Sequence, residues 1–235
     1  MIQRSRREFL HETFSACGAF GVTAALHALG ARLAYGEEYK TSDSLIPVAD
    51  ETTGLELLRL PSGFRYRSFG WSGDTMSDGA LTPTEHDGMG VVQCEDQIVK
   101  LVRNHERSGH GDVLRSDRTT AYDPEANGGC TTLTFDLKNG EWKESWTSIA
   151  GTSRNCAGGI TPWGTWLTCE ETVMGTNAVD HYKDDVQRTF QKTHGWIFEV
   201  DPDGVTDPTP LMDMGRFVHE AVAIDQDTGI SLEMS

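Results

Sequence analysis

Short stretches in which apolar and polar residues alternate recur along the chain, and they predict strands more often than helices. Residues 64–69 (FRYRSF) alternate at period two, which is typical of a half-buried strand. The apolar runs 131–137 and 142–149 flank Asn139-Gly140, a dipeptide that accepts the positive φ angles of a tight hairpin turn. The other expected strands are 90–92 and 98–102, joined by the turn 95–97, and then 163–168, 195–200 and 221–224. The pattern therefore predicts an all-β protein.

A strand end followed by an aspartate and, a few residues later, by a glycine recurs along the chain. The copies are Asp136 with Gly140, Asp201 with Gly204, and Asp225 with Gly229. Such an aspartate hydrogen-bonds the turn backbone, and the glycine takes the left-handed position. Repeated short antiparallel strands with these turns fit a β-propeller better than a sandwich, although the copies are irregularly spaced. We expect one polar helix, around residues 180–190, on an insertion between blades.

The N-terminus carries Ser5-Arg6-Arg7-Glu8-Phe9-Leu10, which is typical of a twin-arginine export signal. A mildly apolar stretch follows over residues 14–33, and Ala34-Tyr35-Gly36 places small residues where a cleavage site requires them. We predict a signal peptide over residues 1–36, an extended leader over 37–55, a folded domain over 56–235, and a periplasmic or secreted location. An ordinary amphipathic N-terminal helix and an uncleaved membrane anchor are the alternatives. Because this route exports folded proteins, it hints at a metal centre acquired before export.

Acidic residues outnumber basic ones, 36 to 20 in 235 residues, which gives a formal net charge of −16. The predicted signal removes four arginines and two glutamates, so the acidity belongs to the folded domain. This charge excludes nucleic acid and anionic lipid as the main partners, since both require basic surfaces, and it suits cations. Apolar residues make up 37% of the chain, a share typical of a globular domain rather than a disordered one.

Four cysteines lie beyond the predicted signal: Cys94, Cys130, Cys156 and Cys169. An even number in an oxidising compartment is compatible with disulfides, and the sequence leaves open which thiols are bridged and which are free. The Cys and His residues show no spacing typical of a zinc site.

Residues able to bind metal gather next to strand-like runs, at 85–89 (EHDGM), 103–106 (RNHE), 151–171 and 215–220 (GRFVHE). We expect the glutamates of these segments to point toward a common face, where repulsion between carboxylates favours a bound cation. These glutamates are Glu106, Glu170, Glu171 and Glu220. Carboxylate and carbonyl oxygens suit calcium, whereas a thiolate beside them favours a transition metal such as iron. The alternative is that these acids are solvated, that His105 and His219 are structural, and that Cys156 is a buried small residue or half of a disulfide.

Residues 151–171 (GTSRNCAGGITPWGTWLTCEE) resemble the signature of the PhoX-type alkaline phosphatases. The segments 87–89, 104–106, 194–202 and 215–221 agree with the same family in order and character. The resemblance extends from about residue 56 to 230, which is nearly all of the chain beyond the predicted signal.

The resemblance implies an exported alkaline phosphatase on a β-propeller that uses calcium and iron to hydrolyse phosphomonoesters and release inorganic phosphate. By this analogy Cys156 ligates iron, Glu220 with Glu170 or Glu171 bridges iron and calcium, and the Ala157 carbonyl faces a calcium. Arg154 is the candidate for stabilising the charge that develops on the phosphoryl group. The resemblance makes Asp87, Asn104 and Glu106 further candidates, without separating metal ligands from residues that support them. The implied catalytic set is Cys156, Glu220 and Arg154.

The last residues, 231–235 (SLEMS), depart from the family pattern, and members of the family are much longer. We therefore expect a C-terminally truncated chain that holds about half of the family's propeller. The expected partners are small phosphorylated substrates and the twin-arginine export machinery. We expect a monomer that has no stable membrane association once the signal is cleaved. A non-catalytic, exported, calcium-binding propeller and an inactive phosphatase fragment remain as alternatives.

Overall fold

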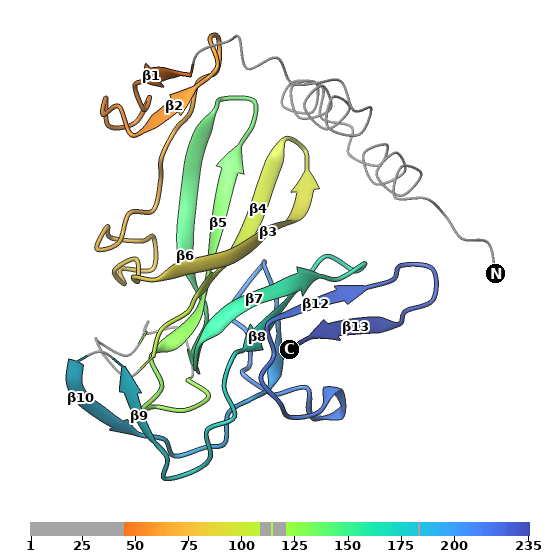
Figure 1. Cartoon of the computed structure of the whole chain (residues 1–235). Coiled ribbons are helices and arrows are strands. Elements are labelled where there is room, and N and C mark those ends of the chain that lie inside the picture. The colour runs from red at the N-terminus through yellow and green to blue at the C-terminus, as the bar shows by residue number, and fades with distance from the viewer. Residues whose placement is uncertain (1–44, 109–113, 115–120, 183) are drawn as a thin grey trace. The chain divides into compact units, whose positions relative to one another are not determined.

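The computed structural model describes residues 45–108, 114, 121–182 and 184–235, which fall into two compact units (Figure 1). One unit extends to Phe69 and the other covers Gly70–Ser235. The predicted signal peptide, residues 1–36, and residues 37–44 of the expected leader lie outside the described residues. No helix in the described ranges has the length and apolar character needed to cross a membrane.

The first unit contains one small antiparallel sheet, in which β1 (Ile46–Val48) pairs with β2 (Leu58–Leu60). The strand predicted over residues 64–69 is wrong, because that segment has no ladder partner. Side chains hold it instead: Asp50 accepts hydrogen bonds from the backbone nitrogen and the hydroxyl of Ser68, and Arg65 and Arg67 pair with Glu51. The polar positions of the alternating pattern, Arg65 and Arg67, thus belong to a loop in which both pair with the same carboxylate, and not to the solvent face of a strand.

The second unit begins with a four-stranded antiparallel sheet in the order β3-β4-β5-β6. The turn between β3 and β4 places Asp96 and Gln97 at positive φ, and the turn between β5 and β6 places Gly140 at φ 66°. Both predicted hairpins are confirmed. The strands are β3 (His86–Glu95), β4 (Ile98–His105), β5 (Gly128–Asp136) and β6 (Glu141–Thr152).

A three-stranded sheet, β11-β8-β7, and a two-stranded sheet, β12-β13, follow, and both are antiparallel. The strands predicted near 163–168, 195–200 and 221–224 are confirmed by β8, β11 and β12. The elements are β7 (Asn155–Ile160), β8 (Trp166–Glu170), β11 (Ile197–Val200), a 3₁₀ turn η1 (Met212–Met214), β12 (Ala221–Ile224) and β13 (Ser231–Met234).

The helix predicted around residues 180–190 is wrong, because a hairpin of β9 (Val179–Tyr182) and β10 (Asp184–Thr189) occupies this segment. Phe190 is buried, and its backbone nitrogen donates to the oxygen of Ala178 at 3.1 Å. Asp180 is buried and pairs with Arg154, a residue of another segment. These tertiary contacts, together with β-branched residues such as Val179 and Thr189, outweigh the polar composition that suggested a helix.

The aspartates of the three turns have the predicted role, and the glycine is left-handed at Gly140 (φ 66°) and Gly229 (φ 69°) but not at Gly204. Asp136 Oδ1 accepts a hydrogen bond from Asn139 N at 3.0 Å, and Asp201 Oδ1 accepts one from Asp203 N at 2.8 Å. Asp225 Oδ1 accepts a hydrogen bond from Asp227 N at 2.9 Å.

Three of the four sheets described in the second unit have their first strands side by side, with β7 in contact with β3 on one side and with β12 on the other (Figure 1). The sheets that contain β3, β7 and β12 therefore meet along their first strands. The described residues are all-β and form several small antiparallel sheets, and they do not close a propeller.

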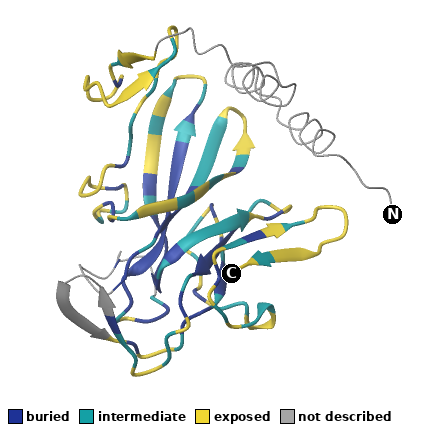
Figure 2. Ribbon diagram, viewed as in Figure 1, coloured by how far each residue is buried: buried dark blue, intermediate teal, exposed yellow. Residues whose placement is uncertain are grey.

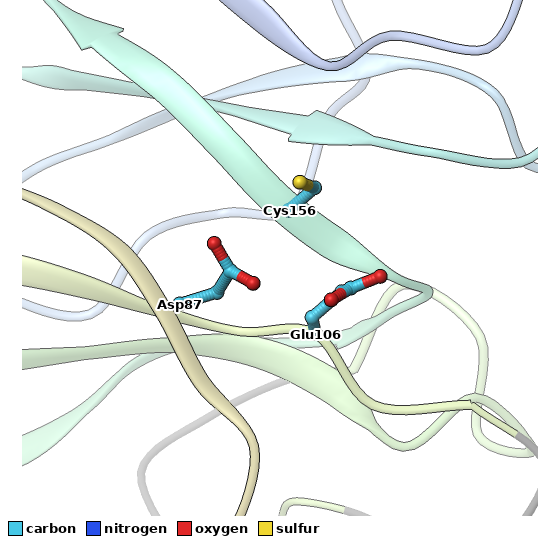
Figure 3. Close-up of side chains that lie close together, drawn as sticks. All are labelled: Asp87, Glu106 and Cys156. Atoms are coloured by element: carbon cyan, nitrogen blue, oxygen red, sulfur yellow. The ribbon is translucent and has the colours of Figure 1, made fainter.

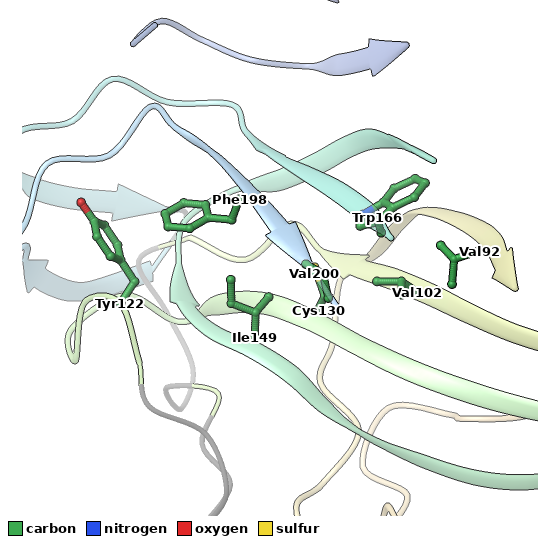
Figure 4. Close-up of a cluster of buried hydrophobic side chains, with 8 residues drawn as sticks. All are labelled: Val92, Val102, Tyr122, Cys130, Ile149, Trp166, Phe198 and Val200. Atoms are coloured by element: carbon green, nitrogen blue, oxygen red, sulfur yellow. The ribbon is translucent and has the colours of Figure 1, made fainter. Parts of the chain in front are cut away.

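The main hydrophobic core lies between the four-stranded sheet and the β11-β8-β7 sheet (Figure 4). Burial of such side chains contributes about 1.5–3 kcal/mol each. Strand β5, the second half of β6 and all of β8 are almost wholly buried (Figure 2). This packing holds the ends of β4 and β8 next to the starts of β3 and β7. The core residues are Val92, Val102, Tyr122, Cys130, Ile149, Trp166, Phe198 and Val200.

Candidate metal centre

Two carboxylates and a thiol lie close together where β3, β4 and β7 meet (Figure 3). Asp87 is the second residue of β3, Glu106 directly follows β4, and Cys156 is the second residue of β7. One ligand atom from each side chain lies within 4.8 Å of the others. Asp87 is exposed, and the other two are partly buried, so the cluster is open to solvent on one side.

The first two sheets present this cluster with the same local backbone. The strand pairs begin with His86 opposite His105 and with Asn155 opposite Glu170. The residue before each first strand is left-handed, with φ 56° at Glu85 and 51° at Arg154.

The residue after each second strand donates its backbone N–H to that left-handed residue. Glu106 N donates to Glu85 O at 2.9 Å, and Glu171 N donates to Arg154 O at the same distance. Cys156 and Glu171 therefore take the places in the second sheet that Asp87 and Glu106 take in the first. The sequence shows no sign of this repeat, because the equivalent residues differ in type.

Negative charge accumulates at the cluster. Partial burial, hydrogen bonds with Asp87 and Glu171, and the charges of both raise the pKa of Glu106 to about 7. Burial, followed by the charges of Asp87, Glu171, Glu106 and Glu220, raises the pKa of the Cys156 thiol to about 12. Hydrogen bonds between carboxyl groups require a shared proton, which a cation replaces while it ionises the thiol. The donor chemistry of these residues thus fits a bound metal ion.

We expect the variant Glu106→Gln to stabilise the metal-free protein by about 1 kcal/mol at pH 8, since screening at a partly exposed site keeps the effect small. The pKa of Glu106 is raised from 4.5 to about 7. Protonation of Glu106 therefore stabilises the folded state fully below pH 4.5, and this stabilisation is lost as the pH rises through 7. The amide keeps hydrogen bonds to its neighbours without that proton. Urea unfolding with a chelator at pH 8 and at pH 4 tests this, and the gain is expected only at pH 8.

The exposed Glu95, at the far end of β3, provides the matched control. Glu95→Gln is expected to leave the stability unchanged at both pH values. An equal gain from both variants would attribute the effect to overall charge and would contradict a specific role for the cluster.

Glu170 and Glu171 lie in different surroundings, although the sequence treats them alike. Glu170 is fully buried, and its carboxylate accepts hydrogen bonds from the nitrogens of Ser153 (2.9 Å), Gly195 (2.8 Å) and Trp196 (3.1 Å). It also lies 2.7 Å from Nδ1 of His194. Glu171 instead forms a hydrogen bond with Glu106, and its charge helps to raise the pKa values of Glu106 and Cys156. The structure thus places Glu171, and not Glu170, beside the cluster.

The remaining candidates from the sequence border the cluster. Glu220 directly precedes β12, its side chain is exposed, and its backbone oxygen accepts a hydrogen bond from Ala157 N at 3.1 Å. Arg154 Nη2 donates to Asp180 Oδ1 at 2.7 Å. The Ala157 carbonyl, expected to face a calcium, accepts a hydrogen bond from Asn104 Nδ2 at 2.8 Å.

The other polar candidates are buried in the scaffold. His105 is fully buried between the Thr84 carbonyl and the Thr131 hydroxyl, and burial holds its pKa well below the usual value. His219 is also fully buried, and Nδ1 lies 3.3 Å from Glu233 Oε2. All four cysteines among the described residues are free thiols.

Sequence reasoning missed Asp123 and gave His194 no role beyond the family resemblance. The two side chains meet at 3.3 Å, behind Glu170, and all three are fully buried. Asp123 and His194 are 71 positions apart, and neither belongs to a local pattern that signals the contact.

A family model described as alkaline phosphatase PhoX matches residues 43–148 and 143–232, a range that includes every residue of the cluster. No curated protein and no solved structure matches the chain. Because the matched range covers well over half of the sequence, the chain belongs to the PhoX family of alkaline phosphatases.

Proposed function

We propose that the protein is a metal-dependent phosphomonoesterase of the alkaline phosphatase type that releases inorganic phosphate outside the cytoplasm. The observation that carries the proposal is the cluster of Asp87, Glu106 and Cys156 in a chain of the PhoX family. Burial and mutual repulsion raise the pKa values of the Glu106 carboxyl and the Cys156 thiol, and a cation relieves that repulsion.

The residues that would hold metal are those whose charges meet at the cluster. Cys156 supplies the soft ligand that suits iron, and the carboxylates supply the oxygens that suit calcium. Glu171 rather than Glu170 would be a metal ligand, because hydrogen bonds already occupy the Glu170 carboxylate. The proposed carboxylate ligands are Asp87, Glu106, Glu171 and Glu220.

The bound cations supply positive charge that stabilises the phosphoryl oxygens of the substrate as they gain negative charge. Arg154 would add hydrogen-bond donors for the same oxygens. Its Nη2 is held by Asp180, and its Nε has no partner among the described residues. Nε is buried, but the side chain as a whole is 30% exposed, so Asp180 fixes the guanidinium and leaves its remaining terminal N–H groups to a phosphoryl group.

The same proposal covers the wider setting. The side-by-side arrangement of β3, β7 and β12 supports three blades of a partial propeller, with the cluster at the starts of their first strands. We also propose that the twin-arginine signal of residues 1–36 directs export. The exported protein is a monomer, and its substrates are small phosphorylated molecules. The non-catalytic and inactive alternatives are outcomes of the test.

The test is metal removal and restoration on the full chain. We expect the release of nitrophenol from nitrophenyl phosphate to be lost with a chelator and restored by calcium together with iron. Metal binding without turnover of any phosphoester would favour the non-catalytic calcium-binding protein. A metal-loaded chain that shows no cooperative thermal transition would be an inactive fragment, and either outcome overturns the proposal for this chain.

A further inference from the structure

We propose that His194 is a positioning residue, held between Asp123 and Glu170, that fixes the strand end from which Arg154 and Glu171 enter the site. The proposal rests on the proposed metal site. It concerns residues that lie behind that site and do not touch the metal or the substrate.

The contacts of His194 define an ionic triad, made of Asp123, His194 and Glu170. Nδ1 of His194 lies 2.7 Å from Glu170 Oε1, and Nε2 lies 3.3 Å from Asp123 Oδ2. All three side chains are inaccessible to solvent. Since a carboxylate faces each ring nitrogen, both nitrogens donate and the ring carries a positive charge. Burial lowers the pKa of His194, but the hydrogen bonds and charges of the two acids prevail and raise it to about 9.

The triad joins three segments that are distant in sequence. Asp123 accepts hydrogen bonds from the backbone nitrogens of Gln191 and Lys192, both at 2.8 Å. Glu170 accepts them from Gly195 and Trp196 in the next part of the same loop. Tyr122 adds a hydrogen bond from its hydroxyl to Thr193 O at 2.9 Å. His194 therefore lies at the centre of a loop whose backbone is fixed on both sides.

The triad reaches the site through Glu170. Its carboxylate accepts a hydrogen bond from Ser153 N, the residue before Arg154, and Glu170 itself precedes Glu171. The backbone bond from Glu171 N to Arg154 O closes this small unit at 2.9 Å. Any displacement of the Glu170 carboxylate therefore moves the backbone that carries the proposed metal ligand and the proposed phosphate-binding arginine.

At the equivalent strand end of the first sheet, the side chain in the place of Glu170 is held by uncharged partners. At the position equivalent to Glu170, His105 contacts the Thr84 carbonyl at 3.0 Å and the Thr131 hydroxyl at 2.9 Å. Thr84 is in turn the equivalent of Ser153. The second sheet replaces this contact with three charged groups, and it is the sheet that carries both Arg154 and the thiol. Supporting contacts of this kind commonly change metal affinity roughly 10–100-fold when removed.

The test measures the metal affinity of the full chain with Tb³⁺, a luminescent ion that occupies calcium sites. We expect His194→Gln to weaken Tb³⁺ binding roughly tenfold or more, because the neutral side chain releases Glu170. The control is Ile149→Val, a fully buried core substitution outside the triad. It is expected to lower the melting temperature and to leave the affinity unchanged.

A second variant covers the case in which His194→Gln does not fold. Asp123→Asn retains an oxygen that accepts hydrogen bonds and leaves the contact between His194 and Glu170 in place, and we expect a smaller, few-fold loss of affinity. If either folded variant melts at a lower temperature but binds Tb³⁺ as the wild type does, the triad is merely structural and the inference is overturned. A wild-type chain that binds no Tb³⁺ overturns the metal site itself.

Discussion

Replacement of Cys156 by serine is expected to reduce the affinity for transition metals at least about a hundredfold and to abolish phosphatase activity. Serine keeps the size of the side chain, but its hydroxyl does not ionise to a soft ligand. Burial and the charges of four carboxylates already raise the pKa of the thiol to about 12, so only a cation at the site favours the thiolate. Calcium binding, which depends on the carboxylates, is expected to change only a few-fold.

Titration with Co²⁺ measures this effect directly, because a thiolate bound to Co²⁺ gives a charge-transfer absorption that oxygen ligands do not give. The wild type and Cys94→Ser are expected to show the absorption, and Cys156→Ser is expected to lack it. Cys94 is the matched control, since it is a free and exposed cysteine on β3. Absorption that survives in Cys156→Ser but disappears in Cys94→Ser would place the metal elsewhere.

The parts of the fold that the sequence predicted correctly depend on local chemistry. Asn139-Gly140 sets a tight turn whatever surrounds it, and the aspartates at 136, 201 and 225 cap their own turns. The apolar run 98–102 predicted a strand, and it lies in β4, whose residues are buried or half-buried. The expectations that were wrong, at 64–69 and 180–190, both fell where distant charged side chains hold the segment.

The site was predictable as a set of strand ends but not in its details. Glu106 and Glu171 follow strand-like runs, so the sequence predicted that they point toward a common face. Neighbouring residues at a strand end project in opposite directions, and the sequence does not say which of Glu170 and Glu171 faces inward. That choice depends on His194 and on the nitrogens of Gly195 and Trp196, which only the folded chain brings to Glu170.

Both the oxygen and the nitrogen of the Asn104 side chain form hydrogen bonds next to the site. Among the substitutions considered, its loss is expected to have the largest effect on stability. The side chain is fully buried, and Oδ1 accepts hydrogen bonds from Trp166 Nε1 and Thr168 Oγ1, both at 3.0 Å, and from Cys130 Sγ at 3.1 Å. Nδ2 donates to the carbonyls of Cys156 (3.2 Å) and Ala157 (2.8 Å). The amide thus connects the core to the residue that carries the proposed thiolate ligand.

Asn104→Leu is expected to destabilise the protein by roughly 3–5 kcal/mol, because several buried donors and acceptors lose their partner where water cannot replace it. The melting temperature should fall by on the order of 10 °C. The Co²⁺–thiolate absorption should weaken as well, since the Cys156 backbone is no longer held. Calorimetry and the cobalt titration measure the two effects on the same samples.

The control for Asn104→Leu is Thr132→Val, which removes a buried hydroxyl that has no hydrogen-bond partner among the described residues. Valine has nearly the shape of threonine, and no hydrogen bond is broken, so the substitution is expected to be neutral or slightly stabilising. Equal losses of stability in both variants would show that any polar-to-apolar change in this sheet is harmful. A loss confined to Asn104→Leu, together with the weakened cobalt absorption, would establish that the hydrogen bonds of one amide hold both the core and the metal-binding strand.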